Sequence, residues 1–149
     1  MSGAEPSLGT LRFEADALLA ARAEDLANAA VEMTAPAVSP PLDYSEASIE
    51  ILDEILDEIH HDRANLDEHR AFQLGAVFGS YLGEVLRRAY SAEWGQITGS
   101  DGAPFPGLRL TNGAVIWPWA RAQQRFLDGA ENSVSTYYRY LTKDLSAAS

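Results

Sequence analysis

Residues 74–88, LGAVFGSYLGEVLRR, constrain the fold of this chain more than any other stretch. Gly75, Gly79 and Gly83 are four residues apart, a spacing that places all three along one side of a helix. Each glycine inside a helix costs about 0.5–1 kcal/mol relative to alanine, so three are tolerated only where another backbone packs closely against them. We therefore predict a long central helix whose glycines contact a neighbouring helix, either residues 46–64 or the N-terminal helix.

The central helix also has a recognisable start and two distinct faces. Asn65 and Glu68 fit a capping box, in which the two side chains satisfy backbone N–H groups of the first turn. A helical wheel predicts an apolar face toward the core and a polar face opposite, the latter formed by Gln73, Ser80, Glu84 and Arg87.

Two helices are expected before it. Residues 8–33 are alanine-rich with a thin apolar stripe, which predicts a helix on the outside of the domain or against another chain. Residues 34–41, TAPAVSPP, break that helix because adjacent prolines favour extended backbone. Ser45 then caps a strongly amphipathic helix that runs to about Ala64. The predicted organisation is an N-terminal helix and proline-rich linker at 1–41, a single domain at 42–145 and a frayed tail at 146–149.

The pattern changes to strands after Trp94. Asn112-Gly113 is a strong signal for a tight hairpin between two short apolar runs. The sequence predicts a three-stranded antiparallel meander followed by two helices, with strands at 93–98, 108–111 and 114–117, helices at 118–128 and 132–141, and pairing limited near Pro104–Pro106. The fold class is therefore α+β, a helical layer around the central helix packed on a small sheet.

Charge and composition exclude several classes of function. The 149 residues carry a formal net charge of −11, whereas nucleic acids and anionic membranes are bound by clustered Lys and Arg. Gln73 and Glu84 interrupt the glycine stretch, so it lacks the roughly 20 apolar residues of a membrane span. The absence of cysteine excludes thiol chemistry. No signal peptide is visible in MSGAEPSLGT, so we expect a cytoplasmic protein.

One cluster has the residue types of a metal or catalytic site. Glu58 and His61 form an E-x-x-H pair, with Glu54 one turn earlier and His60 adjacent. Such pairs bind metal in di-iron bundles, but those sites need a second E-x-x-H pair, and the chain has none. A solvated acidic helix face is the interpretation we favour, and we expect no cofactor. A small metal-binding protein or hydrolase using these four residues is the alternative.

A second candidate site lies at the end of the central helix. Glu84 and Arg88 have the i, i+4 spacing of a helical ion pair, which is the simplest interpretation. Alternatively, Glu84, Arg87, Arg88 and Trp94 line a pocket for a small ligand. Aromatic side chains are also enriched at protein interfaces, and those that a core needs least are Trp119 and Tyr140.

The stretches LDYSEASIEILDEIL, GAVFGSYLGEVLRR and FLDGAENSVSTYY, with a tryptophan at position 94, resemble a group of uncharacterised bacterial proteins, the DUF3806-like domains. The resemblance covers residues 42–138, about two thirds of the chain. It departs from the group's pattern at Val77–Phe78 and at Gly129-Ala130-Glu131. The resemblance implies a stand-alone bacterial domain of unknown function in which Glu84, the arginines after it and Trp94 recur, and it implies no catalytic residues.

Because no coherent catalytic set is present, the leading hypothesis is a non-enzymatic interaction or regulatory module. Its acidic helix and surplus aromatic residues predict a protein partner or a second copy of the chain, as in a homodimer.

Overall fold

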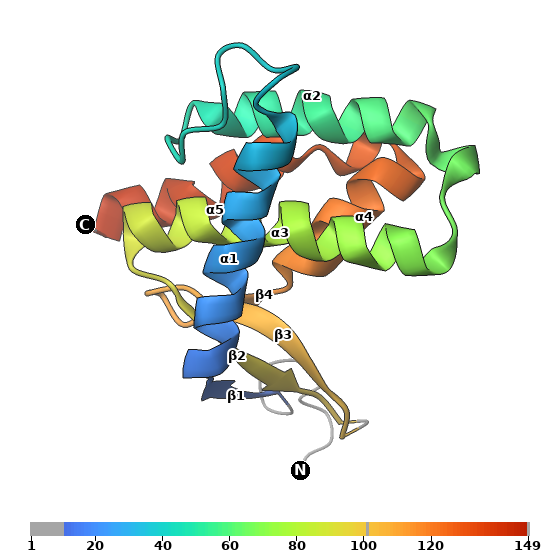
Figure 1. The fold of residues 1–149 in the computed structure, drawn as a ribbon. Helices are drawn as coiled ribbons and strands as arrows, with labels where there is room; N and C mark the ends of the chain where they lie inside the picture. Colours follow the sequence, from blue (N-terminus) through green and yellow to red (C-terminus); the bar gives the residue numbers. More distant parts are fainter. Residues whose placement is uncertain (1–10, 101, 149) are drawn as a thin grey trace.

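The computed structural model describes residues 11–100 and 102–148, and within these ranges the chain forms five α-helices and a four-stranded antiparallel sheet (Figure 1). The predicted α+β class is confirmed. The elements are β1 Arg12–Ala15, α1 Ala17–Thr34, α2 Ser48–His61, α3 Glu68–Tyr90, β2 Glu93–Thr98, β3 Pro104–Arg109, β4 Val115–Ile116, α4 Pro118–Asp128 and α5 Val134–Ala148, with short 3₁₀ turns at Arg63–Asn65 and Ala130–Asn132.

Helix α3 lies in the middle of the helical layer. It packs closely with α1 on one side and with α4 on the other, while α2 packs mainly on α4 and α5 (Figure 1). The sheet lies at one end of this layer, next to the start of α1 (Figure 1). None of the helices in the described ranges has the length and apolar character that a membrane crossing requires.

The sheet has one strand more than the sequence predicted. Strand β1 pairs antiparallel with β2 and gives the order β1-β2-β3-β4. It occupies part of the stretch predicted as helix, whose proposed start at Leu8 lies outside the described residues. The helix begins later because Asp16 caps it, its side chain accepting a hydrogen bond from the Leu19 N–H at 3.0 Å. The same carboxylate accepts a bond from Gln96 of β2 at 3.0 Å, which ties the strand-to-helix junction to the sheet.

The Asn112-Gly113 hairpin is confirmed, with Leu108 opposite Ile116. Pairing also continues through both prolines of β3, Pro104 and Pro106, where the sequence predicted that it would be limited. Within the described residues β4 pairs only with the last two residues of β3, and no strand lies beside the prolines on the side away from β2. A missing N–H is therefore tolerated there.

The ends of α2 and α5 differ from prediction. Helix α2 begins at Ser48, and Ser45 contributes its Oγ as acceptor of the Ser48 N–H at 3.2 Å. Helix α5 runs through Ala148 instead of ending at Leu141, so residues 146–148, expected to fray, are helical, and residue 149 lies outside the description. The Ser133 Oγ accepts from the Thr136 N–H at 3.2 Å and caps its start.

Helix α3 is capped by Asp67, whose side chain accepts from the Arg70 N–H at 2.7 Å, and not by the predicted Asn65. The reason is that Asn65 ends a 3₁₀ turn and donates instead to the Asp62 carboxylate at 2.6 Å. The polar face predicted for α3 is wrong at two positions, because Ser80 and Glu84 are completely buried. Neighbours on several sides enclose the helix along most of its length.

The glycines of α3 face α4 and Trp94, not α2 or α1 as predicted. A Cβ atom added at Gly79 would lie 2.5 Å from Trp119 Cα and 2.6 Å from the Pro118 carbonyl oxygen, both at the start of α4. A Cβ at Gly83 would overlap the indole ring of Trp94. The glycines therefore allow one backbone and one large ring to approach α3 closely.

Candidate functional site

The first predicted site, around Glu84, is a closed cluster inside the protein. The Glu84 carboxylate accepts two hydrogen bonds from Arg87, at 2.8 and 2.9 Å, and one from the Trp94 indole N–H at 2.9 Å. Arg88 lies 3.4 Å away, and its guanidinium stacks 3.6 Å from the ring centroid of Tyr44. The structure thus brings together Glu84, Arg87, Arg88 and Trp94, as the sequence indicated.

These contacts stabilise the fold, and the carboxylate of Glu84 is too buried to contact a ligand. Glu84 is 0% exposed and Trp94 is 1% exposed. Burial by itself raises the pKa of Glu84, but the hydrogen bonds from Arg87 and Trp94 and the charges of the two arginines outweigh it, so the pKa lies below its ordinary value. A buried carboxylate held by Arg87, Arg88 and Trp94 joins the end of α3 to β2.

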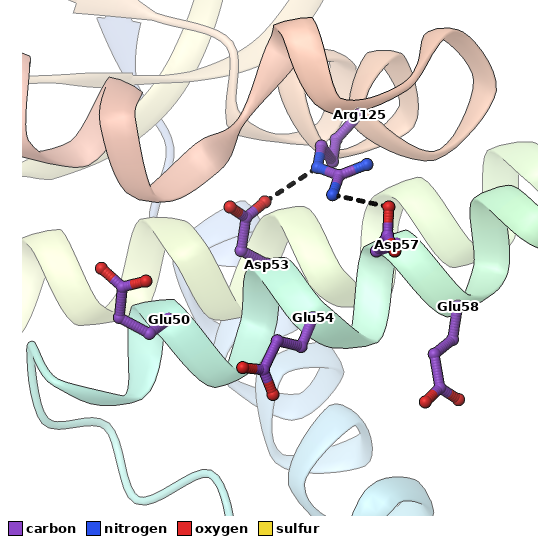
Figure 2. Close-up of a pocket in the computed structure, with 6 residues that line it drawn as sticks. All are labelled: Glu50, Asp53, Glu54, Asp57, Glu58 and Arg125. Atoms are coloured by element: carbon purple, nitrogen blue, oxygen red, sulfur yellow. Dashed lines mark hydrogen bonds and ion pairs between the residues drawn. The ribbon is translucent and has the colours of Figure 1, made fainter.

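The second site could not be found by sequence reasoning and lies between α2 and α4. Figure 2 shows Arg125 of α4 above Asp53 and Asp57 of α2. The arginine is 5% exposed and donates to Asp53 at 2.8 Å and to Asp57 at 3.0 Å. It lines a cavity of about 490 Å³ whose other walls are acidic: Glu50, Asp53, Glu54, Asp57 and Glu58.

Asp53 is the centre of this network. Its carboxylate also accepts from the hydroxyls of Ser133 at 2.8 Å and Ser135 at 3.1 Å, and from the Val134 N–H at 3.2 Å. Burial by itself raises the pKa of Asp53, but the hydrogen bonds from Ser133 and Arg125 outweigh it and leave the pKa below its ordinary value. The Arg125 Nη1 nitrogen is buried and has no hydrogen-bond partner among the residues that the structure describes. Asp53 therefore fixes the start of α5 against α2.

The exposed glutamates of α2 have a different role from Asp53 and Asp57. Glu54 and Glu58 point away from Arg125 (Figure 2), and within the described residues neither has a hydrogen-bond or ion-pair partner. Glu50 pairs only with Arg139, and both side chains are 63% exposed, so that pair is weak. Glu54 and Glu58 are thus the carboxylates of this site that remain free to pair with a ligand.

The same two glutamates border a second, more apolar cavity of about 520 Å³. It lies between the end of α1, the proline-rich segment and α2, and Glu54 and Glu58 separate it from the acidic cavity. Its apolar walls are formed by Met33, Val38, Pro40, Ile51 and Ile55. We call this cavity the α2 groove.

The predicted metal alternative is not supported by the geometry. Within residues 11–100 and 102–148, no three His, Asp or Glu side chains are placed to hold a metal ion together. His60 uses Nδ1 on the Phe126 carbonyl oxygen at 2.8 Å and has Nε2 beside Arg63 at 3.2 Å. His61 contacts the Asp57 backbone oxygen at 2.8 Å. Glu54 and Glu58 point away from Arg125 and have no histidine partner.

The two aromatic candidates differ from each other. Trp119, expected to be least needed by the core, is 7% exposed and donates its indole N–H to Ser80 Oγ at 2.8 Å. That expectation is wrong because Trp119 lies where α4 meets Gly79. Tyr140 is 74% exposed on α5 and remains a surface aromatic residue.

Comparisons with protein families, with curated proteins and with solved structures found no match for this chain. The resemblance to DUF3806-like domains stays a prediction.

Proposed function

We propose that this chain is a non-enzymatic protein-interaction module that binds a basic amphipathic segment of a partner along the α2 groove. The observation that carries this proposal is the placement of Glu54 and Glu58, two unpaired carboxylates on the border of an apolar cavity. A cytoplasmic location, expected from the sequence, is part of the proposal.

Electrostatics favours a positively charged partner. A chain of net charge −11 attracts basic surfaces at long range and raises their rate of association. Asp53 and Asp57 are engaged with Arg125, so Glu54 and Glu58 are the carboxylates of this surface that can pair with Lys or Arg of the partner.

The apolar walls supply the affinity that surface charge does not. Exposed ion pairs contribute about 0.2–1 kcal/mol each, whereas apolar anchors in a groove dominate the energetics of helix-in-groove recognition. Met33 is 48% exposed at the rim, so a partner side chain in the groove covers it. A segment with apolar residues on one face and basic residues beside them fits both features.

Self-association, the other partner expected from the sequence, uses a different surface in this proposal. Two copies meeting through α2 place like charges opposite each other, which costs free energy. Leu18 and Tyr140, 85% and 74% exposed, are the apolar residues that a homodimer covers. Sedimentation of the wild-type chain and of a Leu18→Ser/Tyr140→Ser variant tests that part separately.

The proposal is tested with a synthetic amphipathic helical peptide of leucine and lysine, labelled for fluorescence anisotropy. We expect binding that weakens with added salt, and we expect Glu54→Gln/Glu58→Gln to weaken it by about threefold to tenfold, since two exposed ion pairs are lost. Met33→Ser, which removes part of the groove wall, weakens binding at every salt concentration.

The matched control is Glu14→Gln/Asp25→Asn, which removes the same two charges from exposed positions outside the groove. A general effect of net charge lowers the affinity of both double variants equally and contradicts the proposal. Equal binding of a peptide with glutamate in place of lysine contradicts it as well.

A further inference from the structure

A separate cavity of about 350 Å³ lies between α1 and the N-terminal half of α3, two helices that cross in contact (Figure 1). Its walls are apolar and aromatic, with side chains of Leu26, Phe72, Val77 and Trp119. Two arginines, Arg22 and Arg70, also line it. The volume falls within the range of about 300–1,000 Å³ typical of small-molecule sites.

Neither of these arginines has an acidic partner within the described residues, although the chain has twice as many acidic as basic residues. Within the described residues, Arg22 has no hydrogen-bond or ion-pair partner, and Arg70 donates only to the amide oxygen of Gln73 at 3.4 Å. No aspartate or glutamate from the described part of the chain lines the cavity. Two guanidinium groups without a carboxylate thus lie at an apolar hollow.

The aromatic wall of this cavity is partly exposed to solvent at Phe72. Phe72 is 47% exposed and meets Trp119 edge to face, with ring centroids 6.0 Å apart. The Trp119 indole N–H is already bonded to Ser80, so Trp119 offers the cavity only apolar ring surface. An apolar ligand body that covers Phe72 gains the free energy of removing that surface from water.

We propose that this cavity binds a small apolar carboxylate, with the acid group between Arg22 and Arg70 and the apolar body against Phe72 and Trp119. Guanidinium groups bind carboxylates through paired, charge-assisted hydrogen bonds, which are stronger than bonds between neutral groups. The site is distinct from the α2 groove, so it gives the module a second ligand of opposite charge.

The test uses octanoate as the probe and isothermal titration calorimetry, with NMR of the three indole N–H groups to locate binding. Octanoate is expected to bind and to shift the Trp119 indole signal more than those of Trp94 and Trp117. Octan-1-ol, which has the same apolar body without the charge, is expected to bind about tenfold or more weakly, because it cannot accept charged hydrogen bonds from the two guanidinium groups.

Two variants separate the proposed contacts from general effects. Arg22→Gln/Arg70→Gln weakens octanoate about tenfold or more and leaves octan-1-ol unchanged, whereas Arg12→Gln/Arg139→Gln, with the same net charge, leaves both unchanged. Phe72→Ala weakens both ligands. Absence of octanoate binding, equal affinity for the alcohol, or equal loss in the two arginine variants overturns the proposal. None of the substituted residues lines the α2 groove, so failure of this proposal and failure of the proposed function can be told apart.

Discussion

Replacing Gly79 by alanine tests how tightly α4 is packed on α3. The added Cβ would lie 2.5 Å from Trp119 Cα, 2.6 Å from the Pro118 oxygen and 2.7 Å from the Trp119 nitrogen. Carbon atoms pack favourably at about 3.5–4.0 Å, so the start of α4 has to move by about 1 Å. All three atoms belong to the backbone, so no side-chain rotation relieves the overlap.

The magnitude follows from two opposing effects. Alanine gains about 0.5–1 kcal/mol of helix propensity, and overpacking costs about 1–3 kcal/mol. Movement of α4 also lengthens the 2.8 Å bond between Trp119 and Ser80, which contributes about 0.5–1.5 kcal/mol. We expect Gly79→Ala to lose about 1–3 kcal/mol of unfolding free energy, and Gly79→Leu to lose several kcal/mol or to fail to fold.

Urea denaturation followed by tryptophan fluorescence measures this loss, and Gly75→Ala is the matched control on the same face of α3. Its Cβ would lie 3.2 Å from Gln123 Cβ and 3.2 Å from the Trp119 oxygen, so small shifts suffice, and we expect stability close to that of the wild type. A Gly79→Ala protein as stable as the wild type, or less affected than Gly75→Ala, refutes the argument from close packing.

Two further substitutions test the buried polar contacts of α3 by the same denaturation measurement. Ser80→Ala removes the acceptor of the Trp119 N–H and is expected to cost about 1–3 kcal/mol; a neutral result shows that the N–H finds another partner. Glu84→Gln removes the charge that Arg87 and Trp94 bond and is expected to cost about 2–4 kcal/mol, the lower part of that range applying if the half-exposed arginine is rehydrated. The pKa of Glu84 in the folded state lies below its ordinary 4.5, so in the pH range between these two values the unfolded chain binds more protons. The contribution of the Glu84 carboxylate to stability is therefore complete at neutral pH and is lost as the pH falls through the folded-state pKa. The Glu84→Gln variant should therefore lose less stability than the wild type between pH 5 and the acid limit of folding; equal slopes contradict the assignment of the low pKa to Glu84.

Much of the helical architecture could be predicted because it depends on local patterns. The apolar period of α2, the Asn112-Gly113 hairpin and the glycine spacing of α3 are all visible within a few neighbouring residues. Strand β1 could not be found this way. It has only four residues, RFEA, and it exists because β2, far along the chain, offers an edge to pair with.

The candidate sites show the same limit. The Glu84 cluster is nearly local, since Arg87 and Trp94 are three and ten residues away, and the sequence placed its members together. Asp53 and Arg125 are 72 residues apart, so no local pattern connects them. Asp53 and Asp57, four residues apart, predict only a solvated acidic face of a helix. The contact between Gly79 and α4 could not be predicted for a similar reason. Nothing in the sequence indicates that α4, and not α2, packs against Gly79.

The buried ion pairs leave the net charge of −11 on the rest of the protein. Arg87 and Arg125 are engaged with carboxylates that lie inside or partly inside the protein, so each pair removes one positive and one negative charge from the outer surface. The remaining residues therefore still carry a net charge of −11, which favours a basic partner at Glu54 and Glu58. Arg22 and Arg70 offer the opposite charge at the other cavity, because within the described residues neither forms an ion pair and no aspartate or glutamate lines that cavity. The net negative charge thus supports a basic segment at one cavity, and the two arginines of the other cavity support a small acid there.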